Sequence, residues 1–457
     1  MMESFTNTLE DTKGRRDTPA ASVVLPDGTL AEMVYDPIAG RTAFAVSRAG
    51  EVRYEERLQL DPNSAVRPYS PANSLIKHEI VLFPSEAIPY GSEAELLAAI
   101  RSFIHRYVDL TPLFEELAAY YALFSWLYDG FNELPYLRVK GDTGSGKTRF
   151  LLIVGSLCYK PVFASGASTV SPIFRILDLF QGTLVIDEGD FRVSDEKAEI
   201  VKILNNGNAR GFPVLRSEVT NRRGEFSPRA YRVYGPKLVA TRSAFQDRAL
   251  ESRCLTEELG HRKIREDIPI NLPAGFADEA RVLRNKLLSF RFAHHGRSLA
   301  DQSLVDPTIE PRLNQVFVPL LSVITEDRTR LALKQLLREY QQQLVADRGL
   351  EVDAQVVEVI HIVHEGLPGA DLPLRDITSR FIERYAEEMD RKVTPKWIGG
   401  IIRRRLGLRT ARRCGAYVIP ATERPRLEQL YEKYGVASEP DPGHQPGEDF
   451  ARTSPGL

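Results

Sequence analysis

The feature that most constrains this 457-residue chain is a glycine-rich segment between an apolar run and a helical pattern. The segment reads Gly141-Asp142-Thr143-Gly144-Ser145-Gly146-Lys147-Thr148, a full match to G-x-x-x-x-G-K-[ST]. Residues 136–140 before it predict a strand, and residues 148–157 after it predict a helix. Glycines let backbone N–H groups wrap around phosphates, and a helix start favours negative charge. We therefore expect a nucleotide-binding loop in which Lys147 reaches the β- and γ-phosphates and Thr148 ligates Mg²⁺.

A second motif, Gly182 to Glu188, is an apolar strand that ends in two acids. Buried strands of an open α/β sheet deliver their ligand-binding groups at the carboxyl edge. Asp187 is therefore expected to hold the water shell of Mg²⁺, and Glu188 to polarise an attacking water. An acidic turn that caps a helix is the alternative. The chain has no Asn-Lys-x-Asp guanine-reading pattern, so ATP is preferred to GTP.

A third apolar strand, residues 236–240, ends in Thr241. A polar side chain at this edge is placed to bridge the attacking water and the γ-phosphate. The alternative is an incidental strand end, since any strand can end in Thr.

The spacing of apolar residues divides the chain into seven segments. Short alternating runs predict strands, a period of 3.6 residues predicts helices, and their alternation predicts a parallel sheet with crossover helices. The expected segments are a disordered lead (1–20), a small β-rich domain (21–92), a helical lead-in (93–132), an α/β core (133–260), a helical lid and linker (261–350), a winged helix (351–435) and a disordered tail (436–457).

After the third strand the chain continues with Ala249-Leu250-Glu251-Ser252-Arg253. Taken together, the glycine-rich loop, the Asp-Glu strand, the polar strand end and this Ala-Leu-x-Ser-Arg pattern resemble an AAA+ ATPase. More narrowly, they resemble the helicase-related branch with minichromosome-maintenance-like and mobile-element replication proteins. The resemblance covers roughly residues 130–345. It implies a P-loop core with a helical lid, ATP and Mg²⁺ as cofactors, and assembly into a homo-oligomeric ring, expected to be hexameric.

The same resemblance implies roles for three further side chains. Arg253 is the candidate arginine finger, acting on ATP bound by the neighbouring subunit, and Arg248 is the alternative for this role. Arg312, at the start of a lid helix, looks like a second sensor. For either finger candidate, a surface salt bridge is the simpler interpretation. Thr241 departs from the minichromosome-maintenance pattern, in which Asn is usual at that position.

Residues 208–237 form a basic segment between the second and third strands. Two strand-like arms flank a turn that carries Arg222 and Arg223. In the helicase-related branch, a hairpin inserted just before the sensor strand projects into the ring pore. The resemblance therefore implies that Arg222 and Arg223 grip DNA phosphates, whereas a solvated charged loop is the alternative.

The C-terminal part reads as three helices followed by a hairpin, the order of a winged helix. Residues 394–406 are the expected recognition helix, because Thr394-Pro395 is a typical N-cap followed by proline. Residues 391–420 hold nine basic residues and no acid, an electrostatic footprint for a phosphate backbone. A protein-contact role is the alternative. The expected DNA contacts are Lys396, Arg403, Arg404, Arg409, Arg412 and Arg413.

Composition limits the other classes of protein. Lys plus Arg is 60 and Asp plus Glu is 62, so a net charge of −2 conceals this basic module. Three separated cysteines argue against a disulfide scaffold or a cysteine-based zinc site. No apolar run reaches the length of a spanning helix and no signal peptide is evident, so a soluble cytoplasmic protein without a membrane partner is expected.

These observations favour an ATP-driven, ring-forming DNA motor that serves replication of a plasmid, phage or integrated element. A second hypothesis is a DNA-binding initiator or regulatory switch that uses ATP to control assembly without translocating. A third is a defence-type or signalling ATPase whose N-terminal part senses a ligand or partner.

Overall fold

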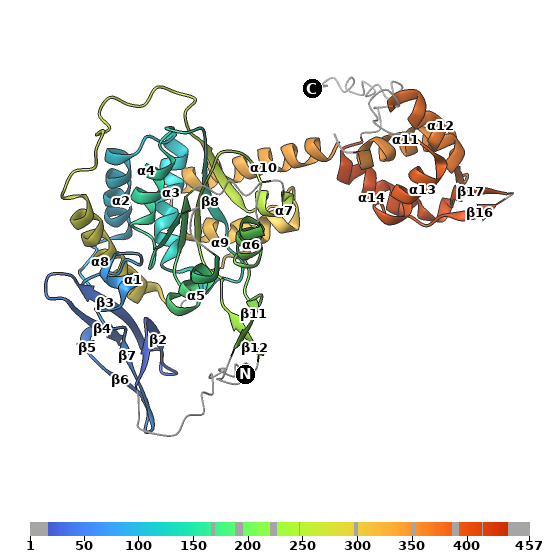
Figure 1. Cartoon of the computed structure of the whole chain (residues 1–457). Coiled ribbons are helices and arrows are strands. Elements are labelled where there is room, and N and C mark those ends of the chain that lie inside the picture. The colour runs from blue at the N-terminus through green and yellow to red at the C-terminus, as the bar shows by residue number, and fades with distance from the viewer. Residues whose placement is uncertain are drawn as a thin grey trace, which may run out of the picture. The chain divides into compact units, whose positions relative to one another are not determined.

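The computed structural model places most of the chain (Figure 1). It describes residues 17–165, 170–187, 195–219, 226–245, 247–296, 300–349, 352–385, 393–413 and 415–436. The chain divides into two compact units, residues 1–335 and 336–457. The first contains the predicted nucleotide site and the second contains the basic C-terminal segment.

The first unit is built around a five-stranded, all-parallel sheet. Its strands are β8 (Tyr136–Lys140), β9 (Val162–Ser165), β10 (Leu184–Asp187), β13 (Lys237–Thr241) and β14 (Cys254–Glu258). Their order in the sheet is β14-β8-β13-β10-β9. The mixed α/β fold with a parallel sheet is therefore as predicted, and β13 separates the strand of the glycine loop from the strand of the acidic motif. Parallel strands end at a common edge, so Thr241, which pairs with Lys140, lies at the same edge as Asp187 on the other neighbouring strand.

Helices surround this sheet. Those of the first unit are α2 (Glu93–Tyr107), α3 (Pro112–Ser125), α4 (Lys147–Gly155), α5 (Val170–Phe180), α6 (Asp195–Asn206), α7 (Arg248–Glu251), α8 (Phe276–His294) and α9 (Pro311–Val323). Helix α4 packs on β8, β10 and β13 and contacts α2 and α3. Helix α10 (Asp327–Gly349) spans the division between the units. The short 3-10 turns are Tyr128–Gly130 and Gln302–Leu304.

The N-terminal part forms two small sheets and a short helix. The first sheet contains β1 (Thr18–Ala20), β6 (Leu58–Asp61) and β7 (Ser64–Pro68), and the second contains β2 (Ser22–Val24), β3 (Leu30–Asp36), β4 (Arg41–Arg48) and β5 (Glu51–Glu55); α1 spans Ser74–Lys77. Apolar residues of these sheets, including Met33 and Phe44, join the same buried cluster as Phe180 and Ile186 of the central fold. The N-terminal sheets therefore share a hydrophobic core with the α/β part.

A buried charge cluster also joins the N-terminal sheets to the central fold. Glu32 on β3 lies 2.9 Å from Lys160 Nζ and accepts a hydrogen bond of 2.8 Å from Arg291 Nε on α8. Burial alone raises the pKa of Glu32, but the neighbouring Lys160 and Arg291 hold that pKa below its ordinary value. Arg291 also pairs with Asp129 at 2.6 Å. A buried pair is costly to break because the remaining charge is left uncompensated, so this cluster ties the two parts together.

An antiparallel hairpin leaves the sheet between α6 and β13. It is formed by β11 (Val214–Val219) and β12 (Phe226–Tyr231), with Val219 opposite Phe226. Arg216 pairs with Glu199 of α6 at 2.8 Å. The predicted tip, with Arg222 and Arg223, lies outside the described residues.

The described part of the second unit contains, after α10, helices α11 to α14 and a three-stranded sheet. Its elements are α11 (Val352–Gly366), β15 (Leu372–Pro373), α12 (Leu374–Tyr385), α13 (Pro395–Arg404), β16 (Ala411–Arg413), β17 (Ala416–Ile419), a 3-10 turn (Ala421–Glu423) and α14 (Arg424–Tyr434). The Thr394 side chain caps α13 by accepting a hydrogen bond from Trp397 N, and Pro395 is the first helical residue. Trp397 and Ile401 pack in the core of this unit, which leaves the polar residues of α13 at its surface.

Lys237 at the start of β13 gives the first unit a specific pH dependence. Its side chain is 0% exposed, and Nζ donates to Val233 O and Gly235 O. Burial lowers the pKa of Lys237 from 10.5 to about 7. Between pH 7 and pH 10.5, Lys237 is protonated in the unfolded chain and neutral in the folded one. The free energy of unfolding therefore rises with pH in this range, by up to about 1.4 kcal/mol per pH unit. Below pH 7 the group is protonated in both states and contributes no slope.

We therefore expect the melting temperature of the wild type to rise relative to that of Lys237→Met as the pH increases from 7 towards 10. Thermal unfolding of both proteins across this range measures the difference. Lys77→Met, which removes an exposed lysine from α1, is the matched control and is expected to differ from the wild type by a constant amount. A constant difference for Lys237→Met as well would show that Lys237 keeps an ordinary pKa in the folded protein.

Candidate nucleotide site

The glycine-rich loop connects β8 to α4 with a backbone that requires its glycines. A Cβ on Gly141 would lie 2.6 Å from Leu259 O, so a side chain there would force the backbone apart. Gly144 and Gly146 have φ of 82° and 97°, in the left-handed region that favours glycine. Gly146 is the N-cap of α4 and supplies no capping side chain. The first N–H groups of α4 are therefore left for an anion, as the motif predicts.

Lys147 lies inside this loop. Its side chain is 7% exposed, and Nζ donates to Gly141 O at 2.6 Å and to Asp142 O at 2.7 Å. Both acceptors are backbone oxygens of the loop itself, so the ammonium group is held where the loop would surround a phosphate. Asp142, Thr143 and Gly144 form the exposed outer part of the turn.

Two residues that are far apart in the sequence meet directly beside the loop. Thr148 Oγ1 donates to Asp187 Oδ2 at 2.7 Å. The other oxygen, Asp187 Oδ1, is buried and has no partner among the described residues. A hydroxyl and a carboxylate in contact are suitable ligands for Mg²⁺, which prefers oxygen. The donor set therefore fits the predicted metal, with one carboxylate oxygen still available to it.

Thr241 completes the group at the carboxyl edge of the sheet. Its backbone oxygen accepts a hydrogen bond of 3.2 Å from Gly141 N, the first amide of the loop. The Thr241 hydroxyl is buried, and neither it nor the Ser145 hydroxyl has a partner among the described residues. A buried polar atom without a partner is costly, so these two hydroxyls point to a ligand that satisfies them. Glu188 lies outside the described residues.

The predicted arginines lie at the opposite edge of the sheet. Arg253 immediately precedes β14, and its backbone oxygen accepts a hydrogen bond from Tyr136 N at the start of β8. Five residues of β14 separate it from the level of the loop, a distance of about 16 Å along the strand. Arg253 is thus remote from the loop of its own chain.

Arg253 is held in a defined position at that edge. Its Nη1 donates to Asn205 O at 3.0 Å and to Asn205 Oδ1 at 2.7 Å, and the same Asn205 donates to Asp247, the N-cap of α7. Burial lowers the pKa of Arg253, and the nearby charge of Arg312 lowers it further. Arg312 donates to Ala249 O at 2.9 Å. The two arginines therefore share one side of α7, which spacing alone did not indicate.

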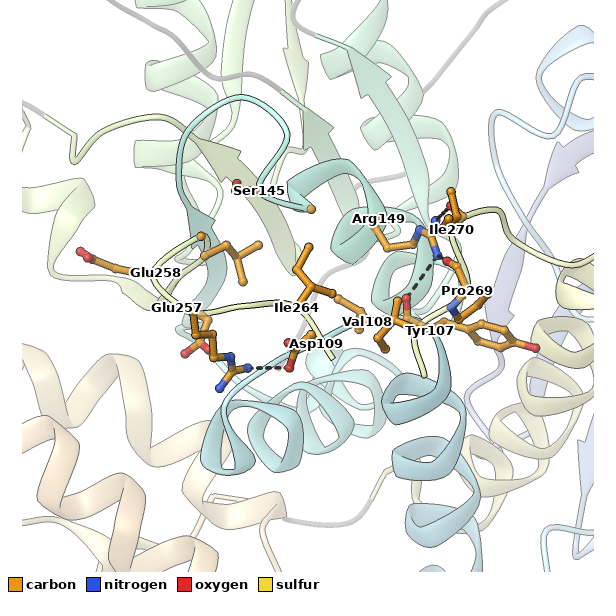
Figure 2. Close-up of a pocket in the computed structure, with 15 residues that line it drawn as sticks. Tyr107, Val108, Asp109, Ser145, Arg149, Glu257, Glu258, Ile264, Pro269 and Ile270 are labelled. Carbon is orange, nitrogen blue, oxygen red and sulfur yellow. Dashed lines mark hydrogen bonds and ion pairs between the residues drawn. The ribbon is translucent and has the colours of Figure 1, made fainter. Parts of the chain in front are cut away.

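Sequence reasoning missed an apolar pocket beside the loop, which Figure 2 shows in close-up. The pocket has a volume of about 230 Å³. It is enclosed by the end of α2, by Ser145 and Gly146 of the loop, and by the chain after β14. Figure 2 places Ile264 close to Val108 and below the turn of Ser145, with Glu257 and Glu258 on one side and Pro269 and Ile270 on the other. In the sequence, the pocket is indicated only by apolar residues scattered through 259–270, and these have neither a helical nor a strand period.

Arg149 closes one side of this pocket. It follows Thr148 on α4, and its guanidinium donates to Pro269 O at 3.0 Å and to Ile270 O at 2.6 Å (Figure 2). At the other side, Asp109 accepts hydrogen bonds from Arg262 Nη2 and from Arg265 N. These contacts attach the segment after β14 to α4 and to the end of α2, so the pocket and the loop are held together.

The basic residues expected to contact DNA lie in the second unit. All six side chains are exposed: Lys396, Arg403, Arg404, Arg409, Arg412 and Arg413. Within the described part of the chain, Arg413 is the one member that pairs with a carboxylate, Asp371 at 2.8 Å. The others present their charge to solvent from α13, the loop after it and β16.

The sequence matches no protein-family model and no curated protein. Among solved structures, the chain is similar to the apo C-terminal region of NrS-1, with 11% identity and a TM-score of 0.37 over 85% of this chain and 96% of that one. It is also similar to JCV helicase (14% identity, TM-score 0.23, 54% and 66% covered) and to the Aeropyrum pernix ORC1 protein in complex with DNA (14%, 0.18, 76% and 93%). These superpositions are weak, so the function proposed below depends on the site itself.

Among the residues that the structure describes, no helix combines the length and the apolar character that crossing a bilayer requires.

Proposed function

We propose that this chain is an AAA+ ATPase that forms a ring, hexameric by the resemblance of its motifs, and acts as a DNA motor in the replication of a mobile element. The observation that carries the proposal is the 2.7 Å bond between Thr148 and Asp187, beside a glycine loop that encloses Lys147. The residues that would bind the phosphates, the metal ion and the attacking water therefore lie together at one edge of a parallel sheet, where nucleotide hydrolysis requires them.

Each residue of the site has a distinct part in hydrolysis. Lys147 exchanges its two carbonyl acceptors for phosphate oxygens, while Thr148 and Asp187 hold the metal ion. Held by these two residues, Mg²⁺ would supply positive charge that offsets the charge of the phosphates. The hydroxyl of Thr241, which has no partner among the described residues, positions the attacking water against the γ-phosphate, and Glu188, next to Asp187 in the chain, polarises that water.

The apolar pocket beside the loop is the proposed site of the nucleotide base. It adjoins Ser145 and Gly146, and it offers Val108 and Ile264 to the faces of a planar ring. The absence of a guanine-reading motif favours adenine. ATP and Mg²⁺ are therefore the proposed cofactors.

We expect Arg149→Ala to raise the KM for ATP about 10-fold, because its charge-assisted hydrogen bonds to Tyr107 O, Pro269 O and Ile270 O in the wall of the base pocket are lost. The kcat is expected to change less than twofold, since Arg149 bonds to Pro269 and Ile270 rather than to the predicted phosphate or metal ligands. Arg149→Lys keeps the charge but cannot span both carbonyls with a planar fork, so it is expected to raise the KM as well. Steady-state kinetics measure both values, and an unchanged KM would separate this pocket from nucleotide binding.

The position of Arg253 supports action between subunits. Because it lies about 16 Å along the strand from the loop of its own chain, it serves a nucleotide only across an interface. In a head-to-tail ring, the amino edge of one sheet meets the nucleotide of the next subunit. Arg312 lies beside α7 with Arg253, so we propose that the second sensor acts from the same subunit as the finger.

DNA is the proposed partner. We interpret the second unit as a winged helix, with α13 as its recognition helix and β16–β17 as its wing. Its exposed cations are suited to a phosphate backbone, and Arg222 and Arg223 of the hairpin are assigned to the ring pore.

The test of the proposal is ATP hydrolysis by the purified full chain, measured with and without Mg²⁺ and with single- and double-stranded DNA. We expect hydrolysis to require Mg²⁺ and to increase with DNA. Mass photometry with ATP and DNA is expected to detect the ring. Hydrolysis that no form of DNA stimulates would contradict the proposal.

A double variant, Arg403→Ala with Arg412→Ala, is expected to weaken DNA binding and to reduce the slope of log affinity against log salt by about 2. Each side chain is exposed and is expected to displace one counterion. Arg375→Ala on α12 is the control, because it removes an exposed charge of the same unit that is paired with Asp376. Fluorescence anisotropy at several salt concentrations measures the slope. Equal slopes in the three proteins would assign the basic surface to a protein contact instead.

The second candidate is a DNA-binding switch that uses ATP to control assembly and does not translocate. The hairpin β11–β12 separates the two candidates, since a switch does not need a pore loop. Strand displacement by the wild type that is lost in an Arg222→Ala, Arg223→Ala double variant supports the motor. Assembly on DNA without strand displacement in either protein supports the switch.

A further inference from the structure

A second cavity lies between the N-terminal sheets and the helix of the glycine loop. It has a volume of about 400 Å³, within the usual range for small-molecule sites. One wall comes from the end of β3 and from residues 76–83 after it, another from α8, and a third from Leu152 and Ser156 of α4 and its C-cap. The interior is apolar and buried, with Ile76, Val81, Phe83 and Ala280. Neither the predicted site nor the proposed function uses this cavity.

A buried guanidinium lines the cavity. Arg284 of α8 is 6% exposed, and it donates to Ser156 O at 2.8 Å and to Phe83 O at 3.3 Å. Both partners are neutral carbonyls, and no described carboxylate forms an ion pair with it. Burial lowers the pKa of Arg284 to about 10, so the group remains charged at neutral pH. A guanidinium has five N–H donors, and the bonds to Phe83 O and Ser156 O leave donors of Arg284 available.

The other charges around the cavity do not neutralise Arg284. Arg281 also lines it but is paired with Asp278 at 2.8 Å. Glu79 and His78 lie at the exposed end, and Glu79 acts on Arg284 only as a charge at a distance. A buried cation that no carboxylate contacts is costly, since Glu79 favours its charge only from a distance, and an anion in the cavity would lower that cost.

We propose that this cavity binds a small organic acid, with its apolar body against Ile76, Phe83 and Ala280 and its anionic group on Arg284. The carboxylates and phosphates of small molecules share this chemistry. The acid would also contact Leu152 and Ser156, and therefore the helix that begins with Lys147. The proposal does not depend on the function proposed above.

The probe is anilinonaphthalene sulfonate, an aromatic anion whose fluorescence rises when it leaves water. Its neutral analogue N-phenylnaphthylamine has a similar aromatic body without the sulfonate. Both are titrated into the full chain without nucleotide, so a chain that did not hydrolyse ATP would still give an interpretable result. We expect one saturable site that binds the anion about 10-fold or more tightly than the neutral compound.

Three variants locate this binding. Arg284→Gln keeps a donor for Ser156 O but removes the charge, and is expected to lower the affinity for the sulfonate about 10-fold or more with little effect on the neutral compound. Ala277→Phe places a ring at the exposed end of the cavity and is expected to exclude both dyes. Val282→Phe adds the same ring at an exposed position of α8 that does not line the cavity, and is the control.

Competition with decanoate and with phenyl phosphate distinguishes the two sources of the anion. Displacement of the dye by decanoate assigns a carboxylic acid, and displacement by phenyl phosphate assigns a phosphate. Displacement by neither compound overturns the proposal. Wild-type affinity of Ala277→Phe for the sulfonate would also overturn it. Ala277→Phe leaves Arg284 in place, so this result remains available even if Arg284→Gln does not fold.

Discussion

Replacement of Lys147 by Ala is expected to lower kcat/KM for ATP hydrolysis by about 100-fold or more. In the structure, the Lys147 ammonium is buried inside the glycine loop on the oxygens of Gly141 and Asp142. Without it, the loop loses the charge that would meet the β- and γ-phosphates. Binding of a fluorescent ATP analogue and steady-state hydrolysis measure the loss.

Lys140→Ala is the matched control for this experiment. Lys140 is the last residue of β8, directly before the loop, and it pairs with Glu258. Its removal takes a lysine from the same neighbourhood without touching the interior of the loop. We expect its kcat to stay within about twofold of the wild type, because the pair with Glu258 is partly exposed and Lys140 holds neither a phosphate nor the metal in the proposed site. If Lys147→Ala kept the same activity as Lys140→Ala, the loop would not be the nucleotide site.

The second large effect is expected at the other edge of the sheet. Arg253→Ala should lower kcat by about 1000-fold, the effect of an arginine finger, while ATP binding changes little. Arg253 is positioned by Asn205, and it lies too far from its own loop to act there. Single-turnover hydrolysis and analogue binding, measured on the same preparation, separate the two quantities. The variant should also form the same oligomer as the wild type.

Mixed assemblies test whether Arg253 acts across an interface. An Arg253→Ala subunit retains Lys147, and a Lys147→Ala subunit retains Arg253. An interface is therefore active where the first binds ATP and the second, as its neighbour, supplies the arginine. An equal mixture of the two inactive proteins is expected to recover about one quarter of the wild-type activity. No recovery from stable mixed rings would exclude action between subunits.

The rival arginine is tested in the same way. Arg248 is the first residue of α7 and is exposed, five residues before Arg253. Arg248→Ala is expected to hydrolyse ATP at more than half of the wild-type rate. A large loss in this variant, with activity retained in Arg253→Ala, would exchange the two assignments.

Much of the candidate nucleotide site could be predicted because its residues are adjacent in the chain. Gly141 to Thr148 specify a turn into a helix by local conformation, and the glycines at 144 and 146 have the positive φ that the turn requires. Asp187 and Thr241 follow from a rule that needs no coordinates, since parallel strands end at one edge. The contact of Thr148 with Asp187 confirms that these motifs converge.

Other features depend on which segments pack together. Arg312 is 59 positions after Arg253 in the chain, and only the folded chain, in which Arg312 of α9 donates to Ala249 O of α7, brings the two side chains to the same edge. The apolar pocket proposed for the base uses residues 259–270, which have no periodic pattern, so nothing local indicated that they cover the end of α2. Lys160, Arg284 and Arg291 are cations that composition assigns to the surface, whereas the structure buries all three.

The sequence by itself determined the chemistry of this protein: a glycine loop, its lysine and hydroxyl, an acidic strand end and a basic C-terminal segment. These are properties of short stretches, in which backbone preference and charge act over a few residues. Only the tertiary structure decided the strand order that places the strand of Thr241 between those of Lys140 and Asp187, the separation of Arg253 from its own loop, and the cavity around Arg284. Contacts between distant segments are set by the burial of apolar surface in three dimensions, which a local pattern does not specify.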